Sequence, residues 1–66
     1  MGKITNHKLY ILNVARQVHK ENPGDKPAIR QAINDAVDAI VKSSDLIGTE
    51  TENVLVEYAI KLHPKK

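Results

Sequence analysis

The sequence of 66 residues contains no cysteine. Disulfide bonds and thiolate metal sites are therefore excluded, and with them two supports on which very small proteins often rely. A chain of this length buries only about 60 % of the surface that it exposes when unfolded, so we expect a small free energy of unfolding. The lack of thiols is typical of the reducing cytoplasm, and we expect a cytoplasmic protein.

Aromatic residues and long apolar runs are also scarce. Tyr10 and Tyr58 are the only aromatic residues, which argues against the binding of single-stranded nucleic acid by base stacking. No apolar run approaches the roughly 18 residues of a membrane-spanning helix, and the N-terminal residues lack the apolar block of a signal peptide. We therefore expect no association with membranes.

No pattern in the sequence is typical of a catalytic, cofactor or metal site. His7, His19 and His63 are scattered along the chain, and none has a second ligand three or four residues away. Ser43 and Ser44 lie in no Gly-x-Ser-x-Gly motif. We therefore expect a protein that is not an enzyme and that binds no metal, cofactor or small-molecule substrate.

The stretch of residues 26–42 is the element around which we expect the fold to be organised. Its aliphatic residues recur at spacings of three and four, which predicts an amphipathic helix. These residues are Ile29, Ile33, Val37, Ile40 and Val41. A second apolar strip runs beside them and consists of Ala28, Ala32, Ala36 and Ala39. The two strips cover more than half of the circumference, which predicts a helix contacted on two sides.

A first helix is predicted over residues 6–21, with Thr5 or Asn6 as its N-cap. Its expected core face consists of Ile11, Val14, Ala15 and Val18. Residues 22–25, Asn-Pro-Gly-Asp, predict a type II turn with Gly24 at positive φ. Asp25 is the expected cap of the central helix, with Pro27 in its first turn. Because this connection is short, we expect the first two helices to be antiparallel neighbours.

A third helix is predicted over residues 50–63, although residues 54–62 also fit a strand because their β-branched and apolar residues alternate. We favour the helix for two reasons. Thr49 and Glu52 match a capping box, in which each side chain accepts a hydrogen bond from the other residue's amide, and no second clear strand offers a partner. The core face of this helix would consist of Leu55, Tyr58, Ala59 and Leu62.

Several apolar residues exceed what one three-helix core needs. Leu9 falls on the polar side of the first helix, and Val56 and Ile60 point away from the core side of the third. Leu46 and Ile47 lie in the second loop, which we expect them to pin to the core. Excess apolar surface on a small chain indicates oligomerisation or a partner. We therefore expect an all-α protein with a single domain over residues 1–66, a small three-helix unit that pairs as a dimer.

The function that we expect is that of a non-enzymatic protein–protein interaction module, which binds another protein, itself or both. It would act as a regulator, inhibitor or adaptor of the kind that bacteria and phages encode. Binding would place apolar anchors in a groove, with a basic residue at the rim. The expected contact residues are Leu9, Leu12, Arg16, Val56, Ile60 and Lys61.

The alternative is a DNA-binding transcriptional regulator, with a degenerate helix-turn-helix or a basic first helix. Ten Lys and Arg face eight Asp and Glu in the whole chain, and the excess of basic residues lies in the first helix. Contacts to phosphates would come from Lys8, Arg16 and Lys20. The third helix, however, opens with Glu50 and Glu52, whose carboxylates would face the phosphates if it were the recognition helix.

Overall fold

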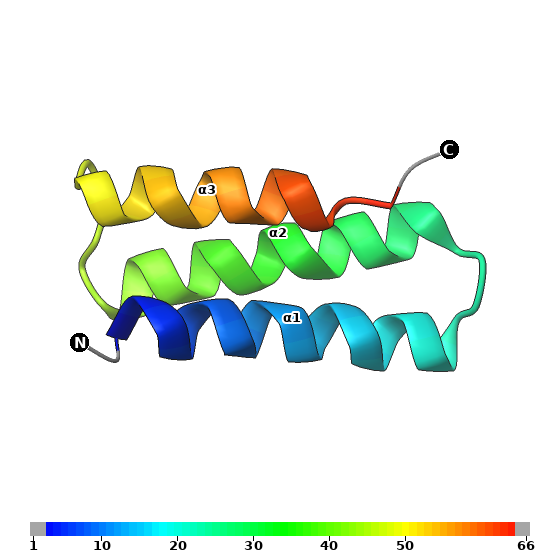
Figure 1. Cartoon of the computed structure of the whole chain (residues 1–66). Coiled ribbons are helices and arrows are strands. Elements are labelled where there is room, and N and C mark those ends of the chain that lie inside the picture. Colours follow the sequence, from blue (N-terminus) through cyan, green and yellow to red (C-terminus); the bar gives the residue numbers. More distant parts are fainter. Residues whose placement is uncertain (1–2, 65–66) are drawn as a thin grey trace.

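The computed structural model describes residues 3–64, and the side chains of residues 5–64. Over these residues it contains three α-helices: α1 is Lys3–Glu21, α2 is Lys26–Ser43 and α3 is Glu50–Leu62. The helices lie side by side, with α1 and α3 running in one direction and α2 in the other (Figure 1). The all-α, three-helix prediction is confirmed for residues 3–64. Residues 1, 2, 65 and 66 of the expected domain lie outside the described part.

The core is aliphatic, and each helix contributes one residue to its centre. Ile11 of α1, Ile33 of α2 and Leu55 of α3 are fully buried. The rest of the buried core consists of Ala15, Ile29, Ala36, Val37, Ile40, Val41 and Ala59. Burial of one large aliphatic side chain contributes about 1.5 to 3 kcal/mol, so the three central residues are among the largest contributors to the stability of the bundle.

Helix α2 contacts both α1 and α3, as its wide apolar arc predicts. Its whole predicted aliphatic face is buried. The alanine strip is covered only in part, because Ala36 is buried whereas Ala39 is exposed. Helix α1 therefore covers the side of the strip that includes Ala36 and leaves the side that includes Ala39 open to solvent.

The first connection forms as predicted. The Asp25 amide donates to the carbonyl of Asn22 (3.1 Å), and Gly24 has a φ of +81°, as a type II turn requires at that position. The Asp25 carboxylate then accepts from the amide of Ala28 at 3.2 Å, and Pro27 lies in the first turn of α2. Helices α1 and α2 are consequently antiparallel neighbours (Figure 1).

The two outer helix boundaries differ from the prediction. Helix α1 begins at Lys3, so the predicted caps Thr5 and Asn6 lie inside the helix and that prediction is wrong. Neither residue breaks a helix, because their propensities are only modestly below that of alanine. Helix α3 ends at Leu62, one residue before the predicted end. His63 has a ψ of 132°, which is the extended conformation that a following proline favours.

A residue in the left-handed region ends helix α2. Asp45 has a φ of +55°, where glycine is the usual residue. The amide of Leu46 donates to the carbonyl of Val41 (2.9 Å) and that of Asp45 to the carbonyl of Lys42 (3.4 Å), the pattern of a Schellman motif. This turn places Leu46 against the core, as predicted. Ile47 is 67 % exposed, so its predicted role is wrong, because the turn directs only one of the two side chains inward.

The N-terminus of α3 forms half of the predicted capping box. The Thr49 hydroxyl accepts from the amide of Glu52 at 3.3 Å, as expected. The Glu52 carboxylate, however, accepts from the amide of Gly48 (2.8 Å) instead of that of Thr49. The reason is that the Thr49 amide already donates to the carbonyl of Leu46 at 3.0 Å.

Residues 54–62 are helical throughout, so the strand interpretation is wrong. Leu55 and Ala59, which are four residues apart, are both buried, and Tyr58 and Leu62 pack against the core beside them. This periodicity of burial is that of a helix covering a helical surface. Residues 3–64 contain no β-strand.

Candidate protein-binding surfaces

Five large apolar side chains of residues 5–64 remain exposed although the core is filled. They are Leu9, Tyr10, Ile47, Val56 and Ile60. Ile60 is 61 % exposed, which confirms that it points away from the core side of α3. These residues do not form one patch, because the three helices leave three separate grooves between them.

The α2–α3 groove is apolar with an acidic rim. Its floor is formed by the buried Val37, Val41 and Ala59, and the exposed Val56 and Ile60 form one wall. Its polar lining residues are Asn34, Asp38 and Glu52. The groove has a volume of about 220 Å³, below the roughly 300 Å³ at which small-molecule pockets usually begin. A shallow apolar trough of this kind fits side chains of another protein better than a small ligand.

The α1–α3 groove is apolar with a basic rim. It is lined by Leu12, Ala15, Arg16, His19, Ile29, Leu62 and Pro64. No carboxylate is among these residues. The Arg30 guanidinium donates to the carbonyl of Pro64 at 3.1 Å, and this bond fixes the chain after α3 at one end of the groove.

The α1–α2 groove contains the open edge of the alanine strip. It is lined by Tyr10, Val14, Ala32, Asp35, Ala36 and Ala39. Tyr10 is exposed there beside small side chains. The exposure of Tyr10 was not predicted, although Tyr10 lies four residues before Val14, at the edge of the predicted core face of α1.

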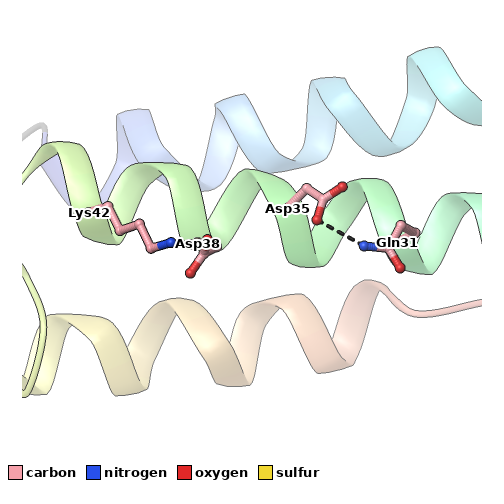
Figure 2. A network of polar contacts seen from close by, with 4 residues as sticks. All are labelled: Gln31, Asp35, Asp38 and Lys42. Carbon is pink, nitrogen blue, oxygen red and sulfur yellow. Dashed lines mark hydrogen bonds and ion pairs between the residues drawn. The ribbon is translucent and has the colours of Figure 1, made fainter.

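The polar face of α2 is solvated. Figure 2 shows its two pairs of side chains. The Gln31 amide donates to Asp35 at 2.9 Å, and the Lys42 ammonium lies 3.1 Å from the carboxylate of Asp38. The second pair is an i, i+4 ion pair, and such an exposed pair contributes only about 0.2 to 0.5 kcal/mol. Each aspartate contacts its own neighbour, so the two carboxylates do not converge on a common point.

The basic residues of α1 differ in their surroundings. The Lys8 ammonium lies 5.3 Å from the centroid of the Tyr58 ring on α3, and its side chain is half-buried. Arg16 and Lys20 are exposed and lie four residues apart, on successive turns of one side of α1. Of the three residues expected to contact DNA, Arg16 and Lys20 are therefore exposed side by side on α1. Lys8 instead contacts the Tyr58 ring on α3.

Helices α2 and α3 form an antiparallel hairpin (Figure 1). In a helix-turn-helix the two helices cross at roughly 90–120°. The arrangement of α2 and α3 therefore gives no support to a recognition helix in α3, and a basic first helix is the version of the DNA-binding alternative that has a structural counterpart.

Titratable side chains do not gather into a site in the described part of the chain. Within the described residues, no group of three or more His, Asp or Glu is placed to hold a metal ion. The His63 imidazole instead lies with its Nε2 atom 3.1 Å from the side-chain oxygen of Asn34, between α3 and α2. None of the helices described is both long enough and apolar enough to cross a membrane.

Four of the six predicted contact residues line one or the other of two grooves. Leu12 and Arg16 line the α1–α3 groove, whereas Val56 and Ile60 line the α2–α3 groove. Leu9 and Lys61 are exposed and line neither groove.

Comparisons with protein-family models, with curated protein sequences and with solved structures give no match for this chain.

Proposed function

We propose that this chain is a non-enzymatic protein–protein interaction module that forms a homodimer. It acts in the cytoplasm as a regulator, inhibitor or adaptor of the bacterial or phage kind. The observation that carries this proposal is the set of exposed large aliphatic side chains outside a filled core, above all Leu9, Val56 and Ile60. Val56 and Ile60 line one apolar groove together, and contiguous apolar surface on a small soluble protein usually marks a contact with another protein.

The α1 side of the bundle is the surface that we assign to a different protein. Leu9, Leu12 and Arg16 follow one another at spacings of three and four, so they form one stripe along α1. Leu62 extends this apolar surface across the α1–α3 groove, and the exposed Lys61 adds a second cation on α3. The stripe fits an amphipathic helix of a partner that carries carboxylates beside its apolar face.

Arg16 is the residue of this surface whose loss should matter most. Arginine can bind a carboxylate through two parallel hydrogen bonds, and it is enriched among the residues that dominate interface energies. His19 lines the same groove. The basic rim would therefore select an acidic partner, while Leu9 and Leu12 supply the apolar contact.

The experiment is an affinity pull-down with tagged protein from a lysate, with and without nuclease. A discrete protein retained in both lysates, and released when Leu9→Asp or Arg16→Glu replaces the wild type, supports the proposal. Ala39→Asp is the matched control, because it places a carboxylate at an exposed apolar position in the α1–α2 groove, outside the stripe of Leu9, Leu12 and Arg16. A partner retained equally by all variants would exclude the α1 surface.

DNA binding through α1 is the second candidate, and the adjacent exposed side chains of Arg16 and Lys20 favour it. In that case retained material disappears after nuclease treatment. The logarithm of the affinity should then fall linearly with the logarithm of salt concentration, and each of Arg16→Gln and Lys20→Gln should lower the slope by about one. An association that does not depend on salt would exclude this candidate.

A further inference from the structure

The apolar residues of the α2–α3 groove stand at matching heights on the two helices. The hydrogen-bond contact between His63 and Asn34 (3.1 Å) joins α3 and α2 at one level. Because a helix rises about 1.5 Å per residue, the residues three positions along each helix, Val37 and Ile60, lie together about 4.5 Å from that level. The residues seven positions along, Val41 and Val56, lie together about 10.5 Å from it. The groove thus has two apolar steps, each with one residue from α2 and one from α3.

Charged residues of opposite sign flank the apolar steps at the loop end of the groove. Lys42 lies eight residues beyond Asn34 on α2, and Glu52 lies eleven residues before His63 on α3. By the same rise, both lie beyond the second apolar step, at about 12 and 16.5 Å. Lys42 is exposed, and its partner within the chain is Asp38 on the same helix, not Glu52. The cation and the Glu52 carboxylate are therefore on opposite sides of the groove.

We propose that a second copy of this chain covers the α2–α3 groove, with a two-fold axis parallel to the helices. Such an axis preserves height and exchanges the two sides of the groove. Ile60 of one copy then packs over Val37 of the second copy, and Val56 over Val41. Helix α2 of one copy lies beside α3 of the other and antiparallel to it, which gives the four-helix packing of an antiparallel bundle.

The same axis brings Lys42 of one copy to the side of Glu52 of the second, with the two residues about 4.5 Å apart in height, and it does so twice. An isologous interface requires this self-complementarity, in which each contact appears in both directions. Two charge pairs at the rim favour this orientation over one in which like charges meet. A foreign basic helix would pair with Glu52 as well, but its cations would repel Lys42, which already neutralises Asp38.

The size of this face is close to what a stable dimer needs. The bundle measures 33 × 19 × 17 Å, so one long face covers roughly 600 Å² in projection (33 × 19 Å). Specific interfaces bury about 800 Å² of accessible surface per partner, and accessible surface exceeds projected area because it follows the side chains. The α1 stripe of Leu9, Leu12 and Arg16 remains uncovered, because α1 lies on the other side of the bundle from this groove.

Sedimentation equilibrium of the wild type and of single variants tests the interface. We expect a dimer for the wild type, and a dissociation constant raised about 100-fold or more by Ile60→Asp, because each interface contains the substitution twice. Leu9→Asp and Ala39→Asp are matched controls, and the dimer should persist in both. A dimer that survives Ile60→Asp would overturn this interface.

Disulfide trapping tests the orientation, and the absence of cysteine from the chain makes it unambiguous. Under oxidising conditions, a mixture of Lys42→Cys and Glu52→Cys proteins should give a covalent dimer that contains one copy of each. Either variant alone should give far less. Faster cross-linking of Lys42→Cys with itself would contradict an axis parallel to the helices.

This inference rests on the homodimer of the proposed function but not on its α1 surface, so the two can fail separately. A monomeric wild type at all concentrations overturns the dimer, whether or not a foreign protein is captured. A dimer lost in Ile60→Asp supports the interface even if no partner for α1 is found.

Discussion

The Lys8 ammonium lies 5.3 Å from the centroid of the Tyr58 ring and joins α1 to α3. At partly exposed sites a cation–π contact contributes about 0.5 to 1 kcal/mol. We therefore predict that a double-mutant cycle of Lys8→Met and Tyr58→Leu, followed by urea denaturation, gives a coupling free energy in this range. Additive effects of the two substitutions would show that the contact contributes nothing to stability.

The fully buried Ile33 and the exposed Ile60 should respond very differently to truncation. Ile33→Ala removes packing from all three helices and should lower the free energy of unfolding by about 2 to 5 kcal/mol, which is enough to unfold a bundle of this size. Ile60→Ala should change the stability of the monomer by less than about 0.5 kcal/mol. Thermal unfolding followed by circular dichroism, at a concentration where only monomer is present, makes the comparison. Equal losses would mean that Ile60 belongs to the core of the monomer.

Asp45→Gly should stabilise the protein. Asp45 has a φ of +55°, a conformation that costs an L-residue about 1 kcal/mol or more and glycine almost nothing. The greater freedom of glycine in the unfolded chain offsets part of this gain, so we expect an increase of about 0.5 kcal/mol in the free energy of unfolding. The matched control is Asp45→Ala, which has no local hydrogen bonds to offer and should destabilise. A loss of stability in Asp45→Gly would mean that the aspartate side chain outweighs the backbone strain.

Removal of the N-cap of α2 should cost stability without affecting the surfaces. The Asp25 carboxylate accepts from the amide of Ala28 at 3.2 Å, and Asp25→Ala should lower the free energy of unfolding by about 1 kcal/mol. Asp25→Ser retains an acceptor and should lose much less. Chemical denaturation of the two variants measures the difference, and identical values would indicate that the hydrogen bond to Ala28 has no net effect.

The helices and their buried faces could be predicted because they depend on local periodicity. Ile29, Ile33 and Val37 recur at the spacing of a helix and are all buried. Asp25 and Thr49 are caps whose acceptor atoms lie within three residues of their donors. Such interactions join residues that are close along the chain, so a single sequence is sufficient to predict them.

Features that depend on a choice between local partners were harder to predict. The Glu52 carboxylate had two amides within reach and bonds that of Gly48, because the turn already engages the amide of Thr49. Asp45 occupies a left-handed position in which glycine would have been recognised. The contact residues could be identified as exposed, but a helical pattern does not tell which neighbouring helix lies beside them. Val56 and Leu12 therefore could not be assigned to different grooves before the packing of the helices was known.

The two short connections of the bundle, residues 22–25 and 44–49, have a consequence for its kinetics. Each joins helices that are neighbours both in sequence and in space, so most of the tertiary structure forms between segments close along the chain. Domains with such local topology fold within microseconds to milliseconds. We therefore expect the folding of each copy to be fast compared with the dissociation of a tight complex. The rate at which copies exchange between complexes would then be set by the contacts at the interface and not by the folding of the chain.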